Sequence, residues 1–353
     1  MTFPAKLVLL LLERYNAFKG AADKGFVMLP CELIERNGDN LRRCVLETAK
    51  KWNMDAAFVA WIEKHNVFCN TLVDRIVTGY PREEVAAFEK RLGYNDILLN
   101  TGEYFHAWVI EGPAWIANEL PFAKVGLNVT LTDNINPYRD RKVRILNGAH
   151  TSTVLAAYLA GKDTVKECMD DQVISKYLAH ILSDEIIPTL DLPKADLDAF
   201  AAAVSERFAN PFIKHLLMSI SLNSTSKYTA RVLPSLKEYI KRKSTLPARL
   251  TFSLAALIAF YRGTEIRGDA LIGKRGTGEY QIKDSANVLE IFATAWKDCD
   301  GSVAAVEKLT AHILAQTAFW HEDLTKIDGL AKAVANQVSA ILTNPAEAIA
   351  KVA

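Results

Sequence analysis

The sequence predicts a mainly α-helical protein in two parts: a mixed α/β part over residues 1–133 and an all-helical part over residues 134–353. Short apolar runs bounded by glycine, proline and asparagine recur in the first part, which is typical of buried strands between turns. Alanine- and leucine-rich stretches at helical spacing fill the second part, with prolines mostly near their ends. The length of 353 residues also fits about two domains.

The first part alternates predicted helices with strand candidates. Helical character runs from Leu7 to Phe18, and Gly20 is positioned to end that helix. Asn37-Gly38-Asp39 is a turn signal that can begin a second helix, reaching Trp52. Four apolar or β-branched runs are the strand candidates: Gly25–Pro30, Val67–Val77, Tyr104–Ile110 and Leu127–Leu131.

The second part opens on a long predicted helix, Pro137–Ala160. Asn136 is placed as its N-cap, proline takes the first helical position, and Gly161 ends it. The glycine-rich stretch Gly263–Gly278 is predicted as a flexible loop. It lacks the preceding strand and the capped helix that a phosphate-binding loop requires. The other predicted helices cover residues 164–187, 194–206, 210–221, 227–243, 246–262, 284–297, 301–315 and 322–343.

Composition narrows the function classes. A formal net charge of +1 gives no electrostatic reason to bind nucleic acid or an anionic membrane. The five cysteines are odd in number and form no C-x-x-C pair, which argues against a disulfide framework or a zinc site and indicates a reducing cytosol. The apolar run Leu7–Leu12 is too short to span a membrane. We therefore expect a cytoplasmic protein with no nucleic-acid, membrane or metal partner.

One short segment carries residues suited to chemistry. Lys142, Asn147 and His150 stand at i, i+5 and i+8. On an α-helix that turns about 100° per residue they point near 0°, 140° and 80°, all to one side. An ammonium, an amide and an imidazole at one patch can polarise a carbonyl and move a proton to or from its oxygen. Gly148 is, like Asn147, a poor helix former, and the pair indicates a close approach by ligand or backbone.

Several blocks carry a family resemblance. The pattern Lys142-x4-Asn147-x2-His150 resembles the signature of the polyol-specific long-chain dehydrogenase/reductase family, which includes mannitol dehydrogenase. Asn70-Thr-Leu-Val-Asp74-Arg75-Ile76 is similar to that family's N-x-M-V-D-R-I segment. Further blocks resemble the branch of the family that interconverts tagaturonate and altronate, and the similarity covers nearly the whole chain: Leu29–Gly38, Arg75–Pro81, Asn147–Thr151 and Leu246–Phe252.

The resemblance implies a fold and a reaction. Residues 1–133 would be the remainder of a Rossmann-like nucleotide-binding domain. Residues 134–353 would be the all-helical, mannitol-dehydrogenase-type substrate domain, similar to the carboxyl-terminal domain of 6-phosphogluconate dehydrogenase. The reaction would be the NAD-dependent interconversion of tagaturonate and altronate in hexuronate catabolism, a part of carbohydrate metabolism, without a metal. The alternatives are another uronate or polyol, such as fructuronate or mannitol, and a catalytically impaired fragment.

The resemblance also assigns catalytic and substrate-binding roles. Lys142 would act as the acid/base, Asn147 would bind the carbonyl oxygen, and His150 would bind a substrate hydroxyl. Arg207 and Asn210 lie in a block similar to the family's R-F-x-N-P, in which the arginine contacts the substrate. A forked guanidinium suits the carboxylate of a uronate.

Other residues are candidates on the same grounds. Asp74 would lie near the substrate, or would close a strand end as an ion pair with Arg75. Glu32 could bond substrate hydroxyls. Leu33 stands where other branches of the family place a second carbonyl-binding asparagine, and a leucine cannot donate a hydrogen bond. Lys227 and Arg249 are weaker candidates for the substrate carboxylate.

Pro30, Cys31 and Asn37 are the cofactor-side candidates, and Asn37 could instead serve only the turn that it begins. The glycine-rich pyrophosphate loop that normally follows the first strand of a dinucleotide-binding domain is not found in the sequence. We therefore expect a chain that lacks the amino-terminal part of that domain. An unpaired sheet edge would also favour self-association through residues 1–133.

Overall fold

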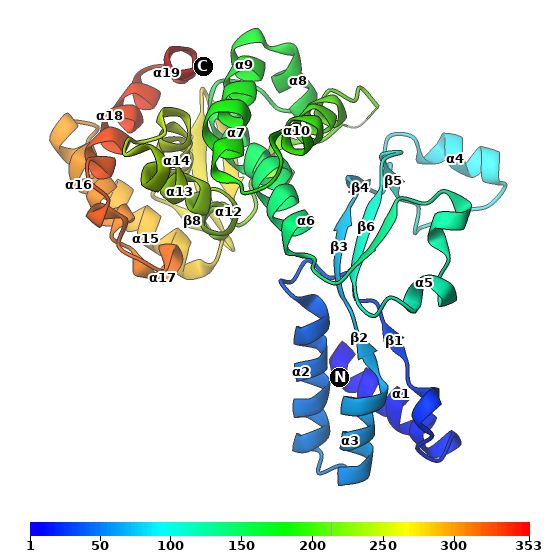
Figure 1. The fold of residues 1–353 in the computed structure, drawn as a ribbon. Coiled ribbons are helices and arrows are strands. Elements are labelled where there is room, and N and C mark those ends of the chain that lie inside the picture. The colour runs from blue at the N-terminus through cyan, green and yellow to red at the C-terminus, as the bar shows by residue number, and fades with distance from the viewer. Residues whose placement is uncertain (213) are drawn as a thin grey trace. The chain divides into compact units, whose positions relative to one another are not determined.

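The computed structural model describes residues 1–212 and 214–353, apart from the Ala123 side chain (Figure 1). The chain divides into two compact units, residues 1–139 and residues 140–353. Helices dominate the element order, so the predicted mainly α-helical fold class is confirmed. None of the helices in the described ranges is long and apolar enough to cross a membrane.

The first unit combines small sheets with helices. β1 pairs in parallel with β2, β4 pairs antiparallel with β5, and β6 lies between antiparallel β3 and parallel β7. The elements are α1 (Phe3–Ala17), β1 (Val27–Met28), α2 (Asn37–Lys51), α3 (Ala56–His65), β2 (Val67–Phe68), β3 (Asn70–Asp74), β4 (Val77–Gly79), α4 (Val85–Leu92), β5 (Thr101–Gly102), β6 (Ala107–Glu111), α5 (Ile116–Glu119), β7 (Val129–Thr132) and α6 (Asn136–Arg141), with 3-10 turns η1 (Ala22–Lys24) and η2 (Phe122–Val125).

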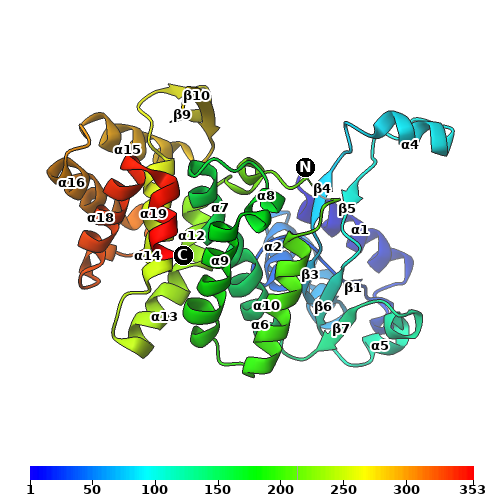
Figure 2. The same ribbon diagram turned by 90° about the horizontal axis from the view of Figure 1, so that it is seen from above.

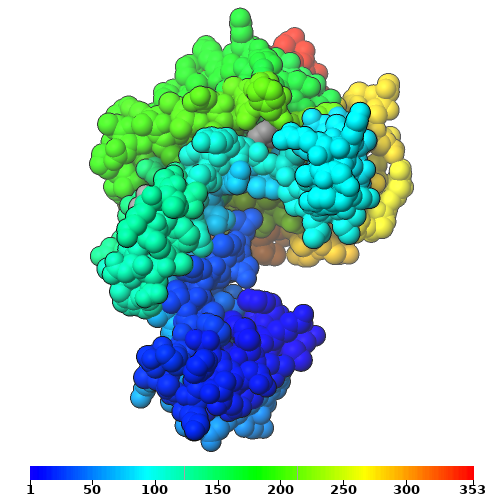
Figure 3. All heavy atoms as spheres, turned by 90° about the vertical axis from the view of Figure 1, so that its right-hand side faces the viewer, coloured from blue at the N-terminus to red at the C-terminus, as the bar shows by residue number. Residues whose placement is uncertain are grey.

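Helices α1, α2 and α3 pack together through one apolar cluster. Their residues belong to the blue mass in Figure 3. The start of α2 is fixed by a neighbouring strand, because the Asn70 side chain accepts hydrogen bonds from the backbone N–H groups of Gly38 and Asp39. A Cβ on Gly38 would lie 2.2 Å from the Cys69 carbonyl oxygen, so only glycine permits this close approach. The sequence pattern Asn37-Gly38 therefore holds α2 against β3.

Among its described residues, the second unit is mainly helical and contains one three-stranded sheet, β8–β10, whose strands pair antiparallel. Its elements are the π-turn η3 (Lys142–Asn147), α7 (Gly148–Leu159), α8 (Val165–Asp170), α9 (Gln172–His180), the π-turn η4 (Ile181–Ile186), η5 (Ile187–Thr189), α10 (Lys194–Phe208), α11 (Leu217–Ile220), α12 (Ser224–Arg231), α13 (Leu233–Lys243), α14 (Ala248–Phe260), β8 (Ile266–Arg267), β9 (Ala270–Arg275), β10 (Gly278–Ile282), α15 (Ala286–Lys297), α16 (Val303–Leu314), α17 (Thr317–Trp320), η6 (Leu324–Lys326), α18 (Leu330–Thr343) and α19 (Pro345–Val352).

Two central helices, α7 and α14, are buried on every side. All residues from Gly148 to Tyr158 are buried, as are all residues from Leu250 to Phe260. A helix that is apolar or small all round must lie inside a core. The two helices contact each other, and Figure 2 shows α7, α9, α12 and α14 gathered at the middle of the helical unit. His150 therefore lies on a rigid, centrally packed helix.

Two predicted long helices differ from the structure in part. The helix predicted over 137–160 is present from Asn136 to Leu159, but its middle, η3, is π-helical instead of α-helical and separates α6 from α7. Residues 164–187 break at Asp171, whose carboxylate accepts hydrogen bonds from the backbone N–H groups of Val173 and Ile174. Asp171 is thus the N-cap of a new helix, α9.

Three other element predictions also fail. The helix expected over 210–221 shrinks to α11, because the His215 carbonyl bonds the Val165 N–H and Leu216 bridges to Thr164; Ile213 lies outside the described residues. The loop expected over 263–278 contains β8, β9 and the start of β10. The helix expected over 322–343 begins only at Leu330, after Gly329 with φ +69°.

Candidate functional site

Lys142 and Asn147 are the first and last residues of the π-turn η3. The Gly148 N–H bonds the Val143 carbonyl, five residues back, so residues five apart stand one turn apart on one face. Asn147 and His150 are three apart where the helix continues as α7, and so they are also neighbours. The π-turn therefore aligns the three predicted residues more closely than the α-helix assumed from the sequence. Single π-turns inside helices are frequent at functional sites.

Gly148 marks a close approach between two helices. A Cβ at this position would lie 3.3 Å from the Arg231 carbonyl oxygen at the end of α12 and 3.6 Å from Ile186 Cδ1. A contact at 3.3 Å leaves almost no room for a side chain, so glycine lets α12 lie against α7. The close approach of the α12 backbone thus explains why a poor helix former stands at Gly148.

His150 is buried, with 8% of its surface exposed. Its ring stacks on Phe208, with centroids 4.1 Å apart, and meets the His215 ring edge-on at 5.3 Å. Its Nε2 atom is buried and has no hydrogen-bond partner among the residues that the structure describes. A buried polar atom left without a partner costs roughly 1–3 kcal/mol, so such an atom at a candidate site is positioned to bond a ligand.

Burial lowers the pKa of His150 well below its ordinary value, and the nearby His215, Arg231, Arg207 and Lys142 lower it further. The imidazole is therefore neutral at pH 7 and can either accept or donate one hydrogen bond at Nε2. Three of these neighbours are lysine or arginine, namely Lys142, Arg207 and Arg231, and we call them the cationic cluster. Such a cluster favours an anionic ligand.

Arg207 and Asn210 lie at the end of α10 and just beyond it. Arg207 is half-buried and belongs to the cationic cluster. The Asn210 Oδ1 atom accepts a hydrogen bond from the Phe212 N–H at 3.0 Å, so this side chain shapes the turn before the chain reaches α11.

Two further cations have contrasting surroundings. Arg249, a weaker carboxylate candidate, bonds Glu185, Asp184 and His180, so its guanidinium is committed to the protein. Lys227 lies one turn before Arg231 on α12, and its Nζ donates to the Ile220 carbonyl at 2.9 Å.

Sequence reasoning did not single out Arg231. The one available signal was the like-charge i, i+4 pair Lys227/Arg231, which is unfavourable on an ordinary exposed helix.

The other predicted residues belong to the first unit. Asp74, buried at 7% exposed, is the last residue of β3. Glu32, Cys31 and Leu33 are exposed in the segment after β1, and Leu33 reaches 86%. Pro30 is buried, and its carbonyl accepts hydrogen bonds from the side chains of Asn37 and Thr71.

Asn37 holds the segment after β1 in place. Its amide nitrogen donates to the carbonyls of Pro30 and Glu32, and its oxygen accepts from the N–H groups of Gly38 and Thr71. These bonds use both sides of the amide, so Asn37 acts on the shape of the segment. The predicted alternative, service to the turn, matches this geometry.

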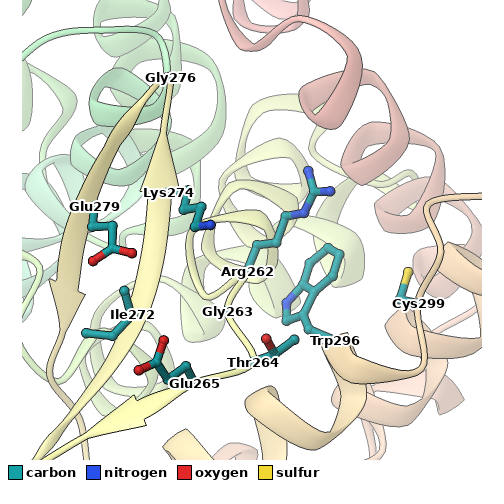
Figure 4. A pocket seen from close by; sticks show the side chains of 10 residues that line it. All are labelled: Arg262, Gly263, Thr264, Glu265, Ile272, Lys274, Gly276, Glu279, Trp296 and Cys299. Carbon is teal, nitrogen blue, oxygen red and sulfur yellow. The ribbon is translucent and has the colours of Figure 1, made fainter.

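One hollow in the second unit lies at the hairpin and not at the π-turn. It measures about 600 Å³ and is bordered by Arg262, Glu265, Lys274, Glu279 and Trp296 (Figure 4). Both glutamates pair with Arg267, and the Arg262 guanidinium lies 5.8 Å from the Trp296 ring. These glutamates are thus already neutralised by the protein. The described residues also contain no cluster of His, Cys, Asp and Glu that could hold a metal ion.

Comparison with known proteins matches both units to one family. Residues 1–124 match the model of the mannitol dehydrogenase Rossmann domain, and residues 134–342 match that of the mannitol dehydrogenase C-terminal domain. The altronate oxidoreductase of Pectobacterium atrosepticum is 49% identical over 343 residues, which are 97% of this chain and 69% of the relative. The altronate oxidoreductase of Escherichia coli O6:K15:H31 is 49% identical over 342 residues, with the same coverage.

Solved structures share the fold. A ternary complex of Pseudomonas fluorescens mannitol 2-dehydrogenase with NAD and D-mannitol superposes with a TM-score of 0.73 at 23% identity, and substrate-free D-sorbitol dehydrogenase with 0.76 at 23%. Each covers 99% of this chain, while the chain spans 66% of the length of each solved protein. By the two domain models and by its relatives at 49% identity, the chain belongs to the mannitol dehydrogenase family of oxidoreductases.

Proposed function

We propose that this chain serves the NAD-dependent interconversion of tagaturonate and altronate. The observation that carries the proposal is the buried Nε2 of His150, unpartnered within the described residues, beside the cationic cluster Lys142, Arg207 and Arg231. A neutral polyol has no negative charge to pair with this cluster, whereas a sugar acid has a carboxylate. The name of the relatives at 49% identity, altronate oxidoreductase, supports the same substrate class.

The proposed chemistry of the chain's own residues is proton transfer and orientation. In the direction of reduction, the Lys142 ammonium gives its proton to the ketone oxygen, and in oxidation its amine takes the proton back. Asn147 donates an amide hydrogen bond to the same oxygen and so stabilises the charge that develops there. His150 bonds a substrate hydroxyl through Nε2, and Arg207 with Asn210 contacts the remaining oxygens. The adjacent π-turn residues keep these groups in register.

NAD, when bound, would supply or accept the hydride at the keto carbon. The segment Pro30–Glu32 follows β1 of a parallel strand pair, and ligands of open α/β sheets bind beyond the carboxyl ends of such strands. Asn37 fixes this segment through the carbonyls of Pro30 and Glu32, leaving Cys31 and Glu32 exposed. We assign Cys31 to the cofactor because its side chain is exposed, and Pro30 because it lies just beyond the end of β1, with Asn37 as their support. Glu32 and Asp74 remain proposed substrate contacts.

The test is turnover by this chain and its Lys142→Ala variant. We expect NADH oxidation that depends on tagaturonate, at rates well above those with fructuronate or fructose, and roughly a thousandfold or greater loss in Lys142→Ala. Lys243→Ala, which removes an exposed lysine at the end of α13, is the matched control and should keep full activity.

Two results would contradict the proposal. Near-normal turnover in a folded Lys142→Ala protein would remove Lys142 from the mechanism. Absence of both NADH binding, followed by fluorescence titration, and turnover in the wild-type chain would instead favour the impaired fragment. A preference for fructuronate or mannitol in the substrate panel would keep the mechanism and replace the substrate.

A further inference from the structure

Arg231 is a half-buried arginine at the end of α12, and no described residue supplies it with a counterion. Helix α12 packs against both α7 and the π-turn η3, and the Arg231 carbonyl closely approaches Gly148. Across residues 1–212 and 214–353, its guanidinium forms no ion pair and no side-chain hydrogen bond. Burial alone lowers the pKa of Arg231. A guanidinium removed from water and left unpaired is costly, so this side chain is suited to an acidic partner from outside the described protein.

Other arginines of the same unit show what a structural role looks like. Arg249 bonds the buried carboxylate of Glu185, and Arg275 bonds Asp163 while lying 3.9 Å from the Tyr158 ring. Each has an acidic partner supplied by the chain. Arg231 differs from both, although it is also partly shielded from water.

The surroundings of Arg231 add charge of the same sign. Burial and the repulsion from Arg231 lower the pKa of Lys227 to about 8, against the opposing effect of Asp284. The Asp284 Oδ2 atom already accepts hydrogen bonds from Thr225 and from the Tyr261 hydroxyl. Arg231 is also one of the cations that act on His150. An anion bound here would pair the guanidinium and relieve the repulsion on Lys227.

We propose that Arg231 binds the carboxylate of the sugar-acid substrate and thereby selects sugar acids over neutral polyols, with Lys227 as a second point of positive charge. This rests on the proposed function, since it places the charged end of that substrate beside His150. The planar guanidinium can bond both oxygens of a carboxylate at once. A hydroxymethyl group has only one oxygen and no charge, so it cannot form this pair of bonds. A desolvated, preformed donor pair discriminates strongly against a ligand that leaves it unpaired.

The test compares sodium D-altronate with neutral D-altritol at matched ionic strength, by calorimetry on this chain in the presence of NADH. We expect Arg231→Met to weaken altronate binding roughly tenfold or more and to leave altritol binding within about twofold of the wild type. Arg231→Lys, which keeps the charge without the fork, should lie between the two. Arg267→Met, which removes an exposed arginine of the hairpin, should change neither affinity.

Altronate binding to Arg231→Met within about twofold of the wild type would overturn the inference and leave the Lys142-dependent reaction standing. Equal weakening of altronate and altritol would show a structural role and overturn it as well, as would a wild-type chain that binds no altronate. If Arg231→Met fails to fold, the Nε–Hε NMR signal of Arg231 in the wild type decides. It should move with altronate and not with altritol, and no movement with altronate would contradict the assignment.

Discussion

At the scale of single residues, the site depends on one histidine kept neutral. His150 lies among Lys142, Arg207, His215 and Arg231, and its burial is the largest cause of its lowered pKa. A protonated imidazole here would add one more positive charge to a cluster of cations. A neutral ring can instead bond a hydroxyl, so the same burial that costs stability in acid suits the hydroxyl contact that we propose for this residue.

The lowered pKa of His150 predicts acid sensitivity. The unfolded chain takes up the proton near pH 6.5 while the folded chain does not, so the unfolded state binds more protons below that pH. The contribution of this group to the free energy of unfolding is therefore fully present above about pH 6.5. It falls as the pH drops, by up to about 1.4 kcal/mol per pH unit. Urea unfolding between about pH 7 and pH 5 should show a smaller loss for His150→Gln than for the wild type.

The matched control for this prediction is His312→Gln, which replaces an exposed histidine on α16. It should keep the wild-type slope. An NMR titration in which the His150 ring protonates near or above its ordinary pKa of about 6.5 would contradict the prediction directly.

The sequence identifies some of these residues and not others for a physical reason. Lys142, Asn147 and His150 share one short segment, so their spacing alone predicts that they meet. Arg231 becomes visible only when the fold shows that no described residue pairs with it, because a lone arginine at a helix end is ordinarily solvated. The sequence leaves Asn37 as a cofactor-side candidate that could instead serve only the turn, and its hydrogen bonds favour the turn.

At the scale of elements, the sequence predicts the buried helix α14 correctly but does not predict that glycines in residues 263–278 belong to strands. The alanine- and leucine-rich stretch predicted as a helix over 246–262 forms α14, Ala248–Phe260. The glycines of residues 263–278 predict a flexible loop, but the structure forms a hairpin there. Gly273 lies opposite Tyr280 in the β9–β10 pair, and a Cβ on Gly273 would lie 2.4 Å from the Tyr280 ring. A glycine in a strand can mark the close approach of an aromatic ring rather than a loop.

This close approach predicts that Gly273→Ala destabilises the hairpin. The Tyr280 ring cannot move aside easily, since it is buried and its hydroxyl bonds the Phe260 carbonyl at 2.7 Å. We expect a loss of about 1–3 kcal/mol, as for other overpacked interiors. Gly278→Ala in the next strand is the matched control, because its Cβ would meet nothing closer than 3.6 Å among the described residues. Urea midpoints that fall equally in the two variants would refute the steric explanation.

At the scale of the whole molecule, the two units differ in how well they cover their apolar surface. The second unit has one extensive core around α7 and α14, whereas the first has a small helical cluster and a smaller one at the sheet. In the first unit, Phe3 and Leu10 on α1 are exposed by 58% and 54%, and within the described residues β1 has a strand on one side only. Exposed apolar side chains and an unpaired strand edge both favour association.

We therefore expect the chain to self-associate through α1 and β1. Leu10→Lys places a charge on the exposed face of α1 and should shift light-scattering mass towards the monomer. Leu222→Lys is the matched control, since Leu222 is also exposed, by 42%, but lies in the second unit, and it should leave the mass distribution unchanged. Because a polar substitution at an exposed site costs little folding energy, a change in mass reports on the surface and not on unfolding. A wild-type chain that is a clean monomer at micromolar concentration would contradict the prediction. An equal response to both substitutions would place the associating surface outside α1.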